Sequence, residues 1–189
     1  MSGVELVTVT KSKITCNDIQ LTGAYTGPKT EKVTNVLMQG CFDVGPRFSC
    51  YTNPLEPGTI ESENPLVGEL GFIPGSKTAL PWVGWDLKSE NPLMPIVSFT
   101  CGEGGGVLLI KLEGSVIGRV KKTDLMVSEF GITYKQSEGK QIPSAFTGGE
   151  EDVLTEVTQP TGPGTKSEQV GLAGNEVVTN AEPLEIKEK

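Results

Sequence analysis

The stretch IVSFTCGEGGGVLLIKL, residues 96–112, decides the fold class. Two runs rich in large apolar and β-branched residues, 96–101 and 107–112, flank a loop of glycines and one glutamate at 102–106. Such runs on either side of a short glycine-containing loop are typical of a β-hairpin. The loop lacks the Gly-Lys-Ser/Thr ending of a phosphate-binding loop, so we predict a hairpin rather than a nucleotide site.

The composition of the whole chain extends this prediction. Its 189 residues include 24 glycines, 37 threonines and valines together, and only five alanines, which favours strands and turns over helices. Further strands are expected at 4–9, 13–25, 33–38, 48–51, 66–72, 83–87, 115–120, 125–135 and 152–157, with short late strands at 169–172, 177–178 and 184–186. About ten to twelve short antiparallel strands predict a single β-sandwich or barrel over 1–189. A surface excursion at 53–65 and a frayed tail at 187–189 are also expected.

The charge of the chain limits the classes of partner that it can bind. A net charge of −8 and a pI near 4.7 argue against nucleic acid and against anionic membrane surfaces. No apolar run reaches the length of a transmembrane helix, so membrane insertion is not expected. The first residues lack the charged and apolar regions of a signal peptide.

The four cysteines, Cys16, Cys41, Cys50 and Cys101, form no CxxC pair, which disfavours a zinc site. An even number in a glycine-rich chain predicts two disulfides and an oxidising compartment; four buried free thiols in a cytosolic protein are the alternative. Three pairings are conceivable. The favoured pairing joins Cys41 to Cys50 across a short turn-rich loop, which leaves Cys16 for Cys101.

Groups suited to catalysis are scarce. The chain has no histidine, which excludes the usual serine and cysteine hydrolases. Glu69, Asp86, Glu103 and Glu113 offer carboxylates for an acid-pair hydrolase, but an acidic strand surface explains them equally well. The acids at 150–152 point in different directions along an extended chain, so a solvated loop is favoured over a calcium site. No enzyme activity, cofactor or metal is therefore predicted.

The aromatic residues supply a candidate ligand platform, Trp82, Trp85 and Tyr51, with Tyr25 and Tyr134 as further members. Trp82 and Trp85 are three positions apart, so on one strand they lie on opposite faces. The simpler interpretation is one core tryptophan and one half-buried tryptophan.

Short pieces in a fixed order run almost from end to end of the chain. They are KITC at 13–16, YTGPKT at 25–30, GC at 40–41, Cys50, PLVGELG at 65–71, WDLK at 85–88, FTC at 99–101, GSVIG at 114–118, KQSEGKQ at 135–141, GGEEDVL at 148–154 and LEIK at 184–187. This set resembles an uncharacterised group of secreted proteins from soil actinobacteria. The resemblance implies a secreted or envelope-associated protein whose four cysteines belong to a shared framework, although the export signal of that group is missing here.

These observations predict a non-catalytic structural or adhesive domain that is secreted or lies at the cell surface and self-associates through edge strands. Two alternatives stay open. One is a binding module for a carbohydrate or small apolar ligand, such as a surface glycan, and the other is a phage or particle surface protein.

Overall fold

The computed structural model describes residues 3–75, 81–103, 106–160 and 163–188. Within these ranges the chain forms sixteen strands and no helix, and every strand pair is antiparallel. The predicted all-β, antiparallel, disulfide-bonded fold is confirmed, and the strands outnumber the ten to twelve expected. The additional strands have only two or three residues, too few to be recognised from composition or alternation.

The strands are numbered in chain order. They are β1 (Val4–Thr8), β2 (Lys13–Cys16), β3 (Asp18–Tyr25), β4 (Thr30–Gln39), β5 (Phe42–Asp43), β6 (Cys50–Tyr51), β7 (Thr59–Glu61), β8 (Leu66–Ile73), β9 (Trp82–Ser89), β10 (Val97–Glu103), β11 (Gly106–Glu113), β12 (Ser115–Val120), β13 (Met126–Ser137), β14 (Lys140–Ile142), β15 (Thr155–Pro160) and β16 (Lys166–Glu185).

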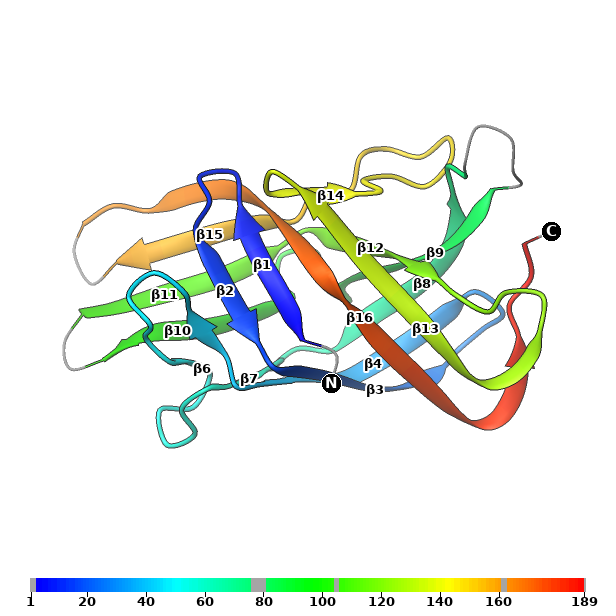
Figure 1. Cartoon of the computed structure of the whole chain (residues 1–189), viewed down its shortest axis with the longest axis horizontal. Coiled ribbons are helices and arrows are strands. Elements are labelled where there is room, and N and C mark those ends of the chain that lie inside the picture. The colour runs from blue at the N-terminus through cyan, green and yellow to red at the C-terminus, as the bar shows by residue number, and fades with distance from the viewer. Residues whose placement is uncertain (1–2, 76–80, 104–105, 161–162, 189) are drawn as a thin grey trace.

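One long strand organises the molecule. The hydrogen-bonded order is β3-β4-β8-β9-β12-β13-β16-β15-β11-β10-β6, and β16 runs diagonally across the molecule in Figure 1. The first part of β16 pairs with β15, its middle pairs with β1, and the rest pairs with β13. β16 therefore joins the β10–β11–β15 end of the molecule to the end that carries β3 and β4 (Figure 1).

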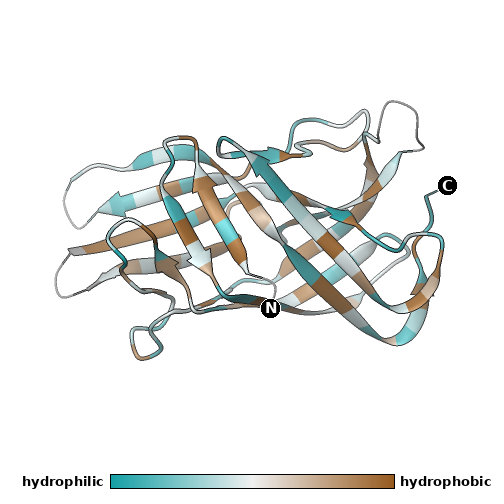
Figure 2. Cartoon of the chain, viewed as in Figure 1, coloured by the Kyte–Doolittle hydropathy of each residue, from teal (hydrophilic) through white to brown (hydrophobic). Residues whose placement is uncertain are grey.

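The core follows the two-residue period of the strands. Hydrophilic and hydrophobic residues alternate along several strands (Figure 2), and in β13 the side chains of Phe130, Ile132 and Tyr134 are buried while their neighbours are more exposed. The sheet from β3 to β16 curls until these two end strands face each other, and the Tyr25 hydroxyl of β3 donates a hydrogen bond to Asn180 Oδ1 of β16.

Strands β8 and β9 are covered on both faces. Trp85 packs on the inner face, and residues 143–154 cover the outer face, where the Phe146 ring lies against Gly71 and Gly84. A Cβ on Gly71 would lie 2.7 Å from this ring, so only glycine leaves room for it. The Thr147 N–H donates to Phe72 O at 2.7 Å and fixes the covering segment to the sheet.

The disulfides join Cys16 to Cys41 and Cys50 to Cys101, so the favoured pairing of Cys41 with Cys50 and of Cys16 with Cys101 is wrong. Strand register decides the pairing rather than loop length. Cys50 of β6 lies directly opposite Cys101 of β10, and Cys16 ends β2 beside the end of β4, where the Asn17 N–H donates to Gln39 O.

The structure adds detail to several local predictions. The hairpin is confirmed as β10 and β11, but pairing extends to Glu103 and Gly106, so its loop is shorter than expected; Gly104 and Gly105 lie outside the described residues. The expected excursion at 53–65 contains β7, whose Ile60 is fully buried. The three short late strands are one strand, β16. In the expected frayed tail, the Glu188 N–H donates to Asp124 Oδ1 at 3.2 Å, and Lys189 lies outside the described residues.

Two disulfides indicate an oxidising environment, as found outside the cell. Over the described ranges, the chain has no helix with the length and apolar character needed to cross a membrane.

Candidate functional site

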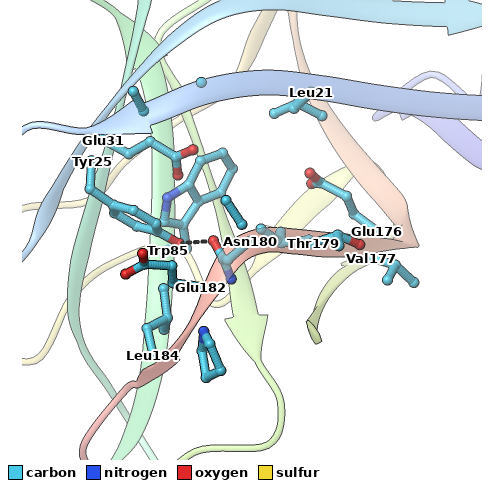
Figure 3. A pocket seen from close by; sticks show the side chains of 15 residues that line it. Leu21, Tyr25, Glu31, Trp85, Glu176, Val177, Thr179, Asn180, Glu182 and Leu184 are labelled. Atoms are coloured by element: carbon cyan, nitrogen blue, oxygen red, sulfur yellow. Dashed lines mark hydrogen bonds between the residues drawn. The ribbon is translucent and has the colours of Figure 1, made fainter. Parts of the chain in front are cut away.

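The candidate site is a cavity of about 560 Å³ between β3 and the second half of β16. Residues from β3, β4, β9 and β16 line it, and Figure 3 shows their side chains converging on one space. The cavity exists because β3 and β16 approach without forming a backbone ladder along this seam: β3 pairs only with β4 among the described strands. Its position inside a curled sheet is typical of ligand sites in β proteins.

The back wall of the cavity is the indole ring of Trp85, a residue of β9 with 4% of its surface exposed. The ring lies across Gly68 of β8, where a Cβ would be only 2.4 Å from the indole nitrogen. Glycine at 68 therefore lets a large aromatic ring lie flat against the neighbouring strand. Leu70, opposite Trp85 in the β8–β9 ladder, packs against the core beside it.

Three carboxyl groups line this cavity, and two of them are withdrawn from solvent. Glu31 of β4 is half-buried, and Glu176 of β16 has 4% of its surface exposed. The third, Glu182 of β16, is exposed, and Figure 3 shows all three around the space that the Trp85 indole borders. Burial raises the pKa of Glu176 to about 7; the hydrogen bond from the Tyr134 hydroxyl at 3.2 Å opposes the shift, and the charge of Glu31 adds to it. Burial also raises the pKa of Glu31.

A polar contact between Tyr25 and Asn180 joins the two strands that border the cavity. The Tyr25 hydroxyl donates to Asn180 Oδ1 at 3.0 Å, which bridges the two facing strands. Burial and the charge of Glu31 raise the pKa of the Tyr25 hydroxyl to about 12, so it stays protonated as a donor. The Asn180 side-chain nitrogen is buried and has no hydrogen-bond partner among the described residues.

A second, more apolar cavity of about 630 Å³ adjoins the first. Both are lined by Tyr25 and Leu184, and the second adds Leu70, Phe72 and Ile186. A molecule seated against Trp85 therefore has an apolar path leading away from the carboxyl groups.

The predicted aromatic platform is divided by the fold. Trp85 faces the cavity, whereas Trp82 lies on the opposite face of β9, where the Arg119 guanidinium sits 3.4 Å from the centre of its ring. Tyr51 belongs to β6 and pairs with Thr100 of β10, in another part of the sheet. The structure instead brings Trp85 together with Tyr25, which the sequence offered only as a further member.

The four acids that the sequence offered for a hydrolase, Glu69, Asp86, Glu103 and Glu113, do not come together as a pair free of other charges. Glu69 and Asp86 are cross-strand neighbours, but Lys88 lies between them, with its Nζ 2.7 Å from Glu69 Oε2 and 3.6 Å from Asp86 Oδ2. Glu113 is exposed on β11, and the Glu103 backbone pairs with Gly106 in the hairpin. No group of three or more cysteines and acidic residues placed to hold a metal ion occurs in the described part, the acids at 150–152 included.

Sequence reasoning missed Glu31, Glu176 and Asn180. The segment from 175 to 180, NEVVTN, does not alternate between polar and apolar residues, so it does not reveal that Glu176, Val178 and Asn180 share the inner face. A buried glutamate can be recognised only once the strand pairing of Glu176 with Ile132 is known.

Comparisons with family models, with curated proteins and with solved structures return no significant match.

Proposed function

We propose that this protein is a non-catalytic binding domain of the cell exterior that holds a small ligand in the cavity between β3 and β16. The cavity itself carries the proposal, because its volume of about 560 Å³ falls in the range of small-molecule sites and it combines an aromatic wall with a few convergent polar groups. The two disulfides and the resemblance to secreted actinobacterial proteins support the location.

The carboxyl groups in the cavity favour binding over hydrolysis. Acid-pair hydrolases need one carboxyl group that is protonated and one that is ionised, so their surroundings push the two pKa values apart. Here burial raises the pKa of both Glu31 and Glu176, and no lysine or arginine lines the cavity to keep one of them ionised as a nucleophile.

The test uses Trp85 as its own reporter. In a Trp82→Phe background Trp85 is the single tryptophan, and its emission is titrated with maltohexaose, cellohexaose, chitotetraose, hexanol, hexanesulfonate and hexyltrimethylammonium. We expect at least one probe to give a saturable change. Asn180→Phe, which fills the cavity, removes that change, while Asn175→Phe, at an exposed position of the same strand, keeps it.

Three outcomes would overturn the proposal. If none of these probes gives a saturable response, or if Asn180→Phe responds like Asn175→Phe, the cavity does not bind small molecules. Release of new reducing ends from any of the three oligosaccharides would identify hydrolysis and contradict a non-catalytic role.

Self-association in a structural or adhesive role is the second candidate. The observation that favours it is the edge of β3 on the side away from β4. This edge faces β16 across the cavity but pairs with no strand of the described chain, so its backbone groups are open to a strand of another molecule. Light scattering distinguishes the two functions, because a structural component forms assemblies at micromolar concentration and a binding domain stays monomeric.

A further inference from the structure

No protein cation accompanies the carboxyl groups of the cavity. None of its fifteen lining residues is lysine or arginine, and in the described chain neither Glu31 nor Glu176 forms an ion pair. Buried carboxylates in proteins are normally paired with a cation or bound to a metal. Glu176 is buried and Glu31 is half-buried, so a positively charged ligand would supply a counter-charge to these two groups when they are ionised.

The shape of the site adds to this charge pattern. The indole of Trp85 lines the same space as the carboxyl groups of Glu31 and Glu176 (Figure 3), and tryptophan is the aromatic residue that attracts cations most strongly. The adjoining apolar cavity, lined by Leu70, Leu184 and Ile186, begins beside Tyr25. A fitting ligand is therefore positive at one end and apolar at the other.

We propose that the ligand is an organic cation, with an ammonium group between Glu31, Glu176 and the Trp85 indole and an apolar chain along Leu70 and Leu184. This inference rests on the proposed function and specifies its substrate class. An anion would meet two carboxyl groups at short range, and a neutral ligand would leave both without a counter-charge.

The experiment compares isosteres in the intact protein by calorimetry at pH 8. Choline and 3,3-dimethyl-1-butanol have nearly the same shape and differ in charge. We expect choline to bind at least about tenfold more tightly. Hexyltrimethylammonium binds more tightly than choline because its chain reaches the apolar cavity, and hexanesulfonate does not compete with it.

Matched variants locate the charge effect. Glu31→Gln and Glu176→Gln each weaken hexyltrimethylammonium binding by about tenfold, which corresponds to one lost charge contact. Glu113→Gln removes an exposed carboxylate outside the cavity and leaves binding unchanged. Near-ultraviolet circular dichroism confirms that the variants keep the native fold.

The affinity also depends on pH. The groups facing the ammonium position are Glu31 of β4, Glu176 and Glu182 of β16, Tyr25 of β3 and, behind Glu176, Tyr134 of β13. Both tyrosines stay neutral up to high pH, while Glu176 takes up a proton below about pH 7. Choline binding is therefore expected to weaken from pH 8 to pH 5.

The outcomes separate this inference from the function on which it rests. If 3,3-dimethyl-1-butanol binds as tightly as choline, or if only an oligosaccharide or hexanesulfonate binds, the inference that the ligand is an organic cation is overturned. The proposed binding function then still stands. If no probe binds, both are overturned. These comparisons use the unaltered protein, so they decide the question even where a variant fails to fold.

Discussion

Asp86 lies in β9 with only 1% of its surface exposed, on the face opposite to the cavity. Burial raises the pKa of its carboxyl group to about 6, and the charge of Asp152 adds to the shift, while Lys88 and the Ser115 hydroxyl oppose it. One of its oxygens, Oδ1, is buried without a hydrogen-bond partner among the described residues. The ionised form of this residue is therefore a source of instability in the native state.

Asp86→Asn is expected to change the pH dependence of stability. In the unfolded chain Asp86 loses its proton near its ordinary value of 3.8, whereas in the native state it keeps the proton to about pH 6. The native state therefore binds more protons between these values, and the free energy of unfolding falls as pH rises, by about 3 kcal/mol for a shift of roughly two units. Urea denaturation at pH 4 and pH 8 measures the fall, which should be smaller in the variant; the variant keeps the part of the fall that the raised pKa of Glu176 contributes. Parallel profiles for the two proteins would contradict the assigned burial.

Among the elements, β16 shows why the sequence was interpreted as three short strands. Gly174 falls between the first two expected pieces and Pro183 between the last two, and both residue types ordinarily weaken a strand. Gly174 is required here, because a Cβ would lie 2.7 Å from Val4 Cγ1 of the paired strand β1. Pro183 is tolerated because it falls where pairing with β13 is irregular, between Thr179 and Leu184. The strands that alternate clearly, such as β13, were predictable from their pattern alone.

The segment that covers β8 and β9 is held by the Thr147 hydrogen bond and by the ring of Phe146, so Phe146→Ala tests the contribution of the ring. The variant leaves Gly71 and Gly84 without the ring that packs on them. Because Phe146 is only half-buried, we expect the free energy of unfolding to drop by about 2 kcal/mol, less than for a fully buried phenylalanine. Cleavage by a glutamate-specific protease at Glu150 and Glu151 should become faster. Phe42→Ala, at an exposed position of β5, serves as the control, and an equal effect of the two variants would show that the segment is not anchored by its ring.

At the scale of the molecule, closure of the sheet creates the site. Glu31 and Trp85 come from strands near one end of the hydrogen-bonded order, and Glu176 comes from β16 beyond β13. No local pattern relates residues so far apart in the chain, so composition predicts the fold class without predicting the cavity. The same limit explains the wrong disulfide pairing, because a short loop between Cys41 and Cys50 is a local argument and strand register is not.

The two disulfides connect neighbouring parts of the sheet at one place. The Cys50 N–H donates to Cys41 O at 3.0 Å, so the backbone of the two residues is adjacent while their sulfur atoms bond to other strands. The bonds span 25 and 51 residues, and loops of these lengths correspond to about 3.5 and about 4 kcal/mol in the chain-entropy treatment.

Peptide mapping distinguishes these bonds from the alternatives, because tryptic cleavage places the cysteines in four separate peptides, 14–29, 33–47, 48–77 and 89–111. Without reductant, we expect 14–29 linked to 33–47 and 48–77 linked to 89–111. Replacing both members of either pair by alanine should lower the free energy of unfolding by about 3 to 4 kcal/mol, with the Cys50–Cys101 pair costing slightly more because its loop is longer. A disulfide between peptides 33–47 and 48–77 would instead join Cys41 to Cys50. That result would contradict the pairing of Cys50 with Cys101 and the register of β6 against β10.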